Sequence, residues 1–87
     1  MKIVEEAVLN AHNKLLDELG KSRRSTPEAK MSRGFGIDSL GIVTLILTVE
    51  EKLDITLDDY LAEIRNAYYV QDFIKIVEKA YFGQKEK

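Results

Sequence analysis

Apolar residues recur at intervals of three and four along most of the chain, the spacing of helices that bury one face. The first helix is expected over about residues 2–19, and Gly20 is a natural end for it. Its apolar stripe consists of Val4, Val8, Ala11, Leu15 and Leu19, with Ala7 beside it. No segment alternates with the period of two that indicates a strand, so the pattern predicts an all-α protein.

The helix predicted to start at Asp38/Ser39 and to end near Leu53 has two separate apolar arcs at 100° per residue. The wider arc, predicted to face the core, consists of Ile42, Leu45, Ile46, Val49 and Leu53. The second arc consists of Leu40, Val43 and Leu47, with Glu50 and Glu51 beside it. One core cannot easily take both arcs, so the second is expected to be at least partly exposed. Periodicity alone leaves open that another helix covers it.

The remaining helices follow the same spacing. A short third helix is expected over about 58–65, with Leu61 and Ile64 on its apolar side. The fourth is expected over about 70–82, with Gly83 as its end and residues 83–87 as a frayed tail. Its stripe consists of Val70, Ile74, Val77 and Tyr81. The prediction is a four-helix bundle of three longer helices and a short third one.

The long loop between the first two helices, residues 21–33, stands out in so small a domain. Loops of this length are uncommon unless they are functional or held down at intervals. Met31 and Phe35 are the expected pins, because each is a large apolar side chain in a polar stretch. The loop is also basic: between residues 20 and 37, five Lys and Arg side chains face Glu28 as the one acid. From Leu40 onward acids outnumber bases, nine to six.

Length and composition narrow the class of protein further. The 87 residues make one domain, 1–87, with a single core. The chain has no cysteine, so disulfides and thiolate metal sites are excluded. The N-terminus lacks the apolar run of a signal peptide, and the longest uncharged run, residues 39–49, is too short to insert through a membrane. We therefore expect a cytoplasmic protein without membrane insertion.

The stretch with the most chemistry runs from Gly34 to Leu40 and reads Gly-Phe-Gly-Ile-Asp-Ser-Leu. Asp38 and Ser39 are both residue types that cap helix N-termini. This places the Ser39 hydroxyl at an exposed helix start, where unpaired amide N–H groups and the helix dipole favour an attached anion. Ser39 is therefore a candidate tethering point for a phosphate-linked group.

This Asp-Ser-Leu segment, with glycines before it and a long apolar helix after it, resembles the acyl carrier protein family. The resemblance runs from about Met31 to Val77 and includes Leu-Asp-Ile at 53–55 and Val-Gln-Asp at 70–72. Where the family commonly has a threonine before Val-Gln-Asp, this chain has Tyr69, so one expected helix cap is missing.

The resemblance implies a 4′-phosphopantetheine arm, taken from coenzyme A and attached to Ser39 between Asp38 and Leu40. The thiol of the arm would hold an acyl or aminoacyl group as a thioester. The implied partners are a phosphopantetheinyl transferase, an acyl or aminoacyl ligase, and condensing or transfer enzymes. The carrier would be a monomer without enzymatic activity. The implied docking residues on the helix after the serine are Leu40, Val43, Leu47, Glu50 and Glu51.

Departures from the family pattern bear on the pathway. Carriers of bacterial fatty-acid synthesis resemble one another in a strongly acidic second helix. This chain has Gly41 and Thr44 at positions where those carriers commonly have carboxylates, and it has Lys52 beside Glu50 and Glu51. We predict a free-standing carrier for a dedicated pathway, such as polyketide or nonribosomal peptide biosynthesis. A housekeeping carrier of fatty acid biosynthesis is the alternative. Any cavity for the cargo would be lined by Ile42, Leu45, Ile46, Leu57, Ala62 and Ile64.

Three other interpretations compete with a carrier. A serine enzyme needs a base near Ser39, but the one histidine, His12, borders the apolar stripe of the first helix, and it forms no metal-ligand spacing with the carboxylates. A nucleic-acid-binding domain would suit the basic loop, but no basic recognition helix is present and the net charge is −2. A helical interaction domain that is never modified would have no need of the Asp-Ser-Leu serine.

Overall fold

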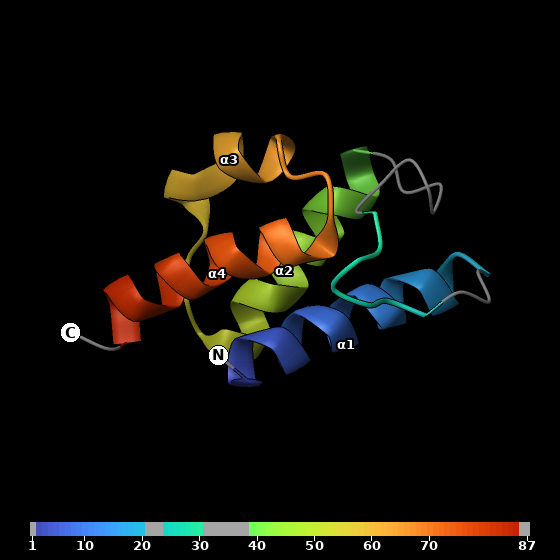
Figure 1. Ribbon diagram of the computed structural model, residues 1–87, viewed down its shortest axis with the longest axis horizontal. Helices are drawn as coiled ribbons and strands as arrows, with labels where there is room; N and C mark the ends of the chain where they lie inside the picture. Colours follow the sequence, from blue (N-terminus) through green and yellow to red (C-terminus); the bar gives the residue numbers. More distant parts are fainter. Residues whose placement is uncertain (1, 21–23, 31–38, 86–87) are drawn as a thin grey trace.

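The computed structural model describes residues 2–20, 24–30 and 39–85, and for Ser39 and Leu40 the backbone alone. Four helices follow one another along the chain (Figure 1): α1 (Lys2–Glu18), α2 (Ser39–Leu53), α3 (Leu61–Arg65) and α4 (Val70–Lys85). A 3-10 turn, η2 (Asp58–Tyr60), leads into α3. The prediction of three longer helices and a short third one is confirmed. Within the described ranges, no helix has the length and hydropathy needed to cross a membrane.

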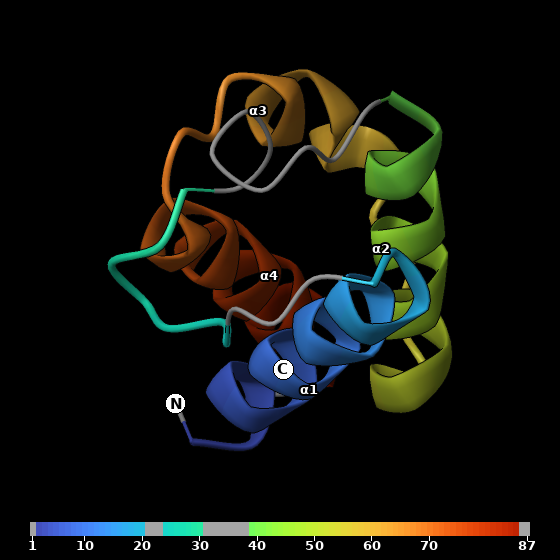
Figure 2. The ribbon, with the colours of Figure 1, turned by 90° about the vertical axis from the view of Figure 1, so that its right-hand side faces the viewer.

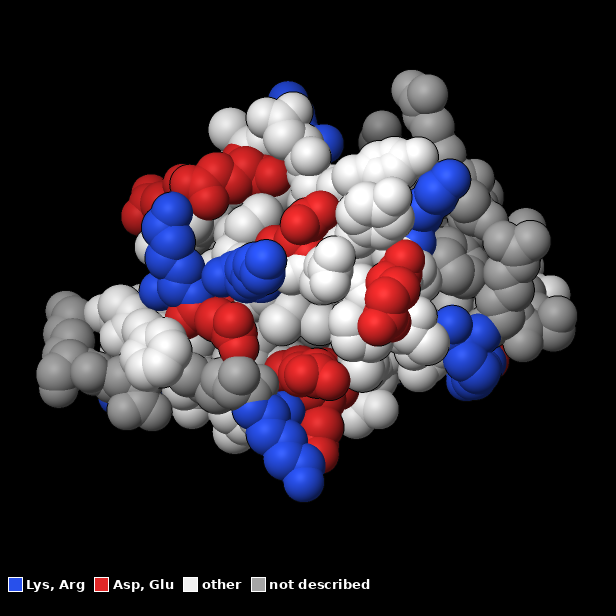
Figure 3. Space-filling view, in the orientation of Figure 1, with Lys and Arg blue, Asp and Glu red and all other residues white. Residues whose placement is uncertain are grey.

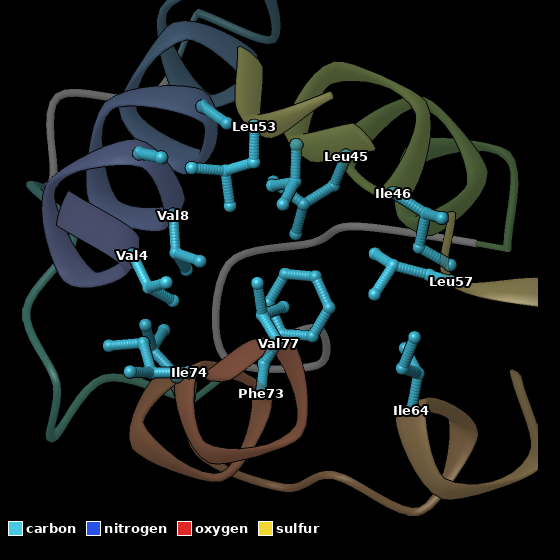
Figure 4. Close-up of a cluster of buried hydrophobic side chains, with 14 of the residues drawn as sticks. Val4, Val8, Leu45, Ile46, Leu53, Leu57, Ile64, Phe73, Ile74 and Val77 are labelled. Carbon is cyan, nitrogen blue, oxygen red and sulfur yellow. The ribbon is translucent and has the colours of Figure 1, made fainter. Parts of the chain in front are cut away.

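Helix α1 lies between α2 and α4 and contacts both, while α3 lies at one side of the bundle against α4 (Figure 2). The core forms where α1, α2 and α4 meet (Figure 4). Its largest fully buried apolar side chains are Phe73, Leu16, Leu45 and Leu57. The predicted core arc of α2 is confirmed, because four of its five residues are buried and Ile42 packs against the core from a half-buried position.

The predicted stripe of α1 is right except at its end. The helix ends at Glu18, and Leu19 is 45% exposed. The chain turns away here, because Gly20 adopts a φ of +75° and its N–H donates to the Asp17 carbonyl. The buried stripe includes Leu16 instead, together with His12, which is fully buried.

The predicted end of α4 at Gly83 is wrong. The helix continues to Lys85, so Gly83–Lys85 are not a frayed tail. The Gln84 side chain bonds the backbone of Thr56, and Lys85 Nζ lies 3.1 Å from Asp54 Oδ2. These contacts with the loop after α2 accompany the extension of the helix by two residues beyond the glycine.

The short α3 buries less than expected. Of its five residues, only Ile64 is buried; Leu61 is 42% exposed and Ala62 is exposed as well. A single helical turn presents one position to the core, so the second predicted apolar residue remains at the surface. Lys79 of α4 adds a surface contact, with its Nζ 3.3 Å from Glu63 Oε1 and 5.6 Å from the centre of the Tyr60 ring.

Carboxylates gather on this side of the molecule. Figure 3 shows acidic side chains over η2 and α3 beside basic ones over α4. The acids belong to a short stretch of sequence that includes Asp58, Asp59 and Glu63. On this face of the molecule, acidic side chains therefore lie over η2 and α3, whereas the first turn of α2 contains no acid.

The described part of the loop after α1 is held down by contacts with α1, the core and the chain before α4. Met31 and Phe35 lie outside the described residues. Within 24–30 the buried residue is Ser25, and Ala29 packs against the core. Lys30 forms an isolated antiparallel bridge with Tyr69, just before α4.

Candidate attachment and docking site

The predicted attachment serine is the first residue of α2. The backbone N–H groups of a first helical turn have no partners within the helix, and the dipole makes this end partly positive. The first turn of α2, which lies within the described residues, contains no acidic side chain to oppose an anion. The backbone position of Ser39 therefore fits a phosphate-linked group. Asp38 lies outside the described residues.

An exposed apolar strip begins one turn after Ser39. Val43 is 50% exposed and Leu47 is 58% exposed, so no other described helix covers them. They are four residues apart and share one face of α2. Leu40 would continue the strip toward Ser39, but its side chain is not described. The expectation that this second arc reaches the surface is confirmed for Val43 and Leu47, whereas their role in docking stays a prediction.

The two glutamates predicted to flank this strip differ in their contacts. Glu51 is exposed, whereas Glu50 is half-buried and its Oε2 accepts a hydrogen bond of 2.6 Å from the Leu57 N–H. The Glu50 carbonyl also accepts a hydrogen bond from the Ile55 N–H, at 3.2 Å. Glu50 therefore fixes the turn after α2 in addition to any part in docking. Periodicity could not find this role, because the contact depends on how the chain turns after α2.

The charge on α2 lies entirely at its C-terminal end. Residues 39–49 contain no charged side chain, and the exposed polar side chain of Thr44 lies in this part of the helix. Thr48 Oγ1 donates to the Thr44 carbonyl at 2.8 Å, which ties its hydroxyl to the helix itself. The exposed surface of α2 is therefore apolar at Val43 and Leu47, and it carries charge only from Glu50 onward.

The residues predicted to border a cargo cavity fall into two groups. Ile46, Leu57 and Ile64 are buried and lie close together between α2, the loop after it and α3 (Figure 4). Leu45 is buried as well, and Ile42 is half-buried. Ala62 is exposed, so this part of the expectation is wrong: it lies two residues before the buried Ile64, about 200° away around the helix.

His12 is fully buried and lies with its Nδ1 2.6 Å from Ser25 Oγ. Burial lowers the pKa of His12 from 6.5 to about 4, because the charged imidazolium loses its hydration. Such a histidine is closed to solvent and packs in the core of the bundle. The spacing of residues along α1 could have predicted this burial, because His12 lies four residues from both Val8 and Leu16, on the buried face of the helix. Among the described residues, no group of three His, Cys, Asp or Glu side chains is placed to hold a metal ion.

The fold and the site define a class: a small helical bundle that presents a serine at the start of a helix with an exposed apolar strip. Comparison with known proteins confirms the resemblance to the acyl carrier protein family. The chain is 42% identical over 53 residues to a protein named acyl carrier protein from Helicobacter pylori strain J99, a match that covers 61% of this chain and 65% of that protein. It is 40% identical, over the same share of each chain, to the acyl carrier protein of the strain HPAG1.

The chain thus spans 65% of the length of the curated relatives that it matches. No protein-family model matches it, and no solved structure matches it.

Proposed function

We propose that this chain is an acyl or aminoacyl carrier with a 4′-phosphopantetheine arm on Ser39. One observation supports this most strongly: a serine opens α2, and Val43 and Leu47 form an exposed apolar strip on the same helix. The similarity to acyl carrier proteins supports the same function. The protein would act as a tether and a recognition surface rather than as an enzyme.

The residues at the start of α2 suit the arm. Ser39 would carry its phosphate, next to the positive end of the helix dipole and without an acid in the first turn. The arm, when attached, supplies a thiol that holds the cargo as a thioester. The tether raises the effective concentration of the cargo at each partner enzyme, which is the benefit of attachment over free diffusion.

The partners would be a phosphopantetheinyl transferase, a loading ligase and enzymes that condense or transfer the cargo. They would contact Leu40, Val43 and Leu47 and be oriented by charge at the C-terminal end of α2. Charge complementarity governs the choice among such partners more than bulk affinity does. Because the first three turns of α2 carry no carboxylate, we infer partners whose binding surface is less basic than that of enzymes selecting an acidic helix.

This charge pattern favours a dedicated biosynthetic pathway over housekeeping fatty-acid synthesis. The decisive comparison is a chain-elongation assay with purified fatty-acid synthesis enzymes and either this protein or the host's own carrier. We expect little or no elongation on this protein. Full replacement of the host's carrier would show that the pathway assignment is wrong while leaving the carrier function intact.

The carrier function itself is tested by incubating the protein with coenzyme A and a broad-specificity phosphopantetheinyl transferase, followed by mass spectrometry of the intact chain. We expect the mass to rise by one phosphopantetheine group, and Ser39→Ala to abolish the gain. Thr44→Ala, which removes an exposed hydroxyl from the same helix, is the matched control and should be modified normally. An unmodified wild-type chain, folded by circular dichroism, would show that the proposal is wrong.

A further inference from the structure

Residues 58–67, called the η2–α3 segment here, lie between two positions of the chain that are held by other parts of the molecule. Before the segment, the N–H and the carbonyl of Thr56 bond the Gln84 side chain, at 2.9 and 2.8 Å. After it, the Val70 N–H donates to the Ala29 carbonyl at 2.7 Å. The segment therefore has a fixed anchor at each end.

Few side chains of the η2–α3 segment are buried. Ile64 is 3% exposed, Tyr60 and Ala67 are half-buried, and the other residues are exposed. At the surface, Lys79 of α4 lies with its Nζ 3.3 Å from Glu63 Oε1. Exposed ion pairs contribute little to stability, and stretches with few buried apolar contacts open at a low free energy. We therefore expect the segment to open while the rest of the bundle stays folded.

Glu50 of α2 holds the residue from which this segment starts. Its Oε2 accepts the Leu57 N–H at 2.6 Å, and the Leu57 carbonyl accepts the Tyr60 N–H at 2.9 Å, within η2. Hydrogen bonds to a charged acceptor are stronger than neutral ones. Glu50 thus orients the residue on which the first turn of the η2–α3 segment is built.

Glu50 also lies beside the exposed strip of α2. It follows Leu47 by three residues, which makes the two side chains neighbours on the helix surface, and Leu47 is 58% exposed. Glu50 itself is half-buried, so part of it is open to solvent. A cationic side chain of a docked protein would compete with the neutral Leu57 N–H for the carboxylate, because bonds between two charged groups are the stronger ones.

We propose that Glu50 couples docking on α2 to the η2–α3 segment: a partner's cationic side chain that pairs with Glu50 weakens its bond to Leu57 and loosens the segment. The coupling rests on the proposed function, because it needs a partner that docks on α2. The hold of Glu50 on the segment does not, and it is a property of the free protein.

This hold is tested by amide hydrogen exchange, read residue by residue by NMR on the full chain. The informative amides are those of Tyr60, Asn66 and Ala67, whose hydrogen bonds lie within the segment or join it to Leu57 and do not include Glu50. Glu50→Ala should raise their exchange rates by about tenfold, the effect of losing a hydrogen bond to a charged group. Glu51→Ala removes the neighbouring exposed carboxylate and should leave the rates unchanged.

The amides of Val70 and Gln71 are the internal control, because they bond the carbonyls of Ala29 and Pro27, outside the segment. Unchanged exchange within the segment in Glu50→Ala would overturn the proposal. An equal rise at Val70 and Gln71 would overturn it as well, because it would mean general destabilisation. Glu50→Gln, which keeps a neutral acceptor, provides a second variant in case Glu50→Ala fails to fold, and it should give a smaller rise at the same amides.

The coupling is tested by repeating the exchange measurement with a saturating amount of the broad-specificity phosphopantetheinyl transferase, without coenzyme A. In wild type, exchange at Tyr60, Asn66 and Ala67 should rise on binding, and in Glu50→Ala it should rise no further. Slower or unchanged exchange in the wild-type complex would overturn the coupling.

Coupling between two sites is reciprocal, so a loosened segment should favour docking. Lys79→Met removes the ion pair with Glu63, and it should lower the KM of the transferase for the carrier by about twofold, the effect of an exposed ion pair. Lys85→Met is the matched control, because it removes the same charge from α4 and an ion pair with Asp54, which precedes the segment. Equal KM values for the two variants would contradict the coupling.

Failure of this proposal can be told apart from failure of the proposed function. A wild-type chain that the transferase modifies, but whose segment does not loosen on binding, remains a carrier without the coupling. If wild type is not modified at all, the proposed function and the coupling fail together, and the exchange rates of the free protein still decide whether Glu50 holds the segment.

Discussion

The side chain of Gln84, near the end of α4, makes two hydrogen bonds with the backbone of Thr56, in the loop after α2. Its Nε2 donates to the Thr56 carbonyl at 2.8 Å, and its Oε1 accepts the Thr56 N–H at 2.9 Å. Both polar groups of one loop peptide position are thereby satisfied from a residue 28 positions away. The last turn of α4 is consequently part of the bundle.

Gln84→Ala should lower the free energy of unfolding by about 1 kcal/mol, because two hydrogen bonds at an exposed site are exchanged for bonds with water. Urea unfolding followed by circular dichroism measures the loss. Gln71→Ala is the control: it has the same chemistry in the same helix, and it keeps the backbone N–H that bonds Pro27. Equal effects of the two substitutions would contradict a specific contact between Gln84 and Thr56.

This contact also shows why part of the fold was not predictable from the sequence. Apolar spacing predicted α1, α2 and α4 and the burial of Leu45, Val49 and Val77, because burial of one helix face depends on local periodicity. The end of α4 was mispredicted at Gly83 because glycine is a local signal for a helix end, whereas the contacts of Gln84 and Lys85 with the loop after α2 are set by tertiary structure.

The candidate site, like the fold, has some features that the sequence predicted and others that depend on tertiary contacts. The helix start at Ser39 and the exposure of Val43 and Leu47 followed from residue types and from the two arcs of α2. The contacts of Ser25 with His12 and of Glu50 with Leu57 did not, because each joins segments whose approach depends on the packed bundle. The Ser39 side chain and Asp38 are not described, so their roles stay predictions.

Substitution of Glu50 should lower the free energy of unfolding more than substitution of Glu51, because Glu50 bonds the turn after α2 and Glu51 is exposed. Glu50→Gln should lower the free energy of unfolding by about 1 kcal/mol, because the Leu57 N–H exchanges a charged acceptor for a neutral one in a half-buried site. Glu51→Gln should change it by less than about 0.5 kcal/mol, since Glu51 is exposed. Thermal and urea unfolding of both variants at neutral pH provide the comparison. A larger loss for Glu51→Gln would show that the assignment is reversed.

Buried His12 should make the protein sensitive to acid. Its pKa is lowered to about 4 in the folded state from 6.5, so as pH falls below about 6.5 the unfolded chain binds the proton first and unfolding becomes easier. The free energy of unfolding should fall by about 2 kcal/mol from this group between about pH 7 and about pH 5, with the loss complete below about pH 4.

Urea unfolding at both pH values, for wild type and His12→Gln, isolates this contribution, because glutamine does not titrate and all other groups are shared. The variant should be less stable than wild type at about pH 7 and should lose about 2 kcal/mol less on acidification. Equal losses for the two proteins would mean that His12 does not carry the pH dependence.

The exposed strip on α2 gives the most direct test of recognition. Leu47 is 58% exposed, so Leu47→Ala should change the free energy of unfolding by no more than about 0.5 kcal/mol. If the side chain enters a partner's surface, however, its loss should lower kcat/KM with the phosphopantetheinyl transferase by about tenfold. Leu19→Ala is the matched control, because Leu19 is a leucine of similar exposure that follows the end of α1 and is not part of α2. Steady-state kinetics of the two variants decide the question: a loss confined to Leu47→Ala places the transferase on this strip, and equal rates for both variants place it elsewhere.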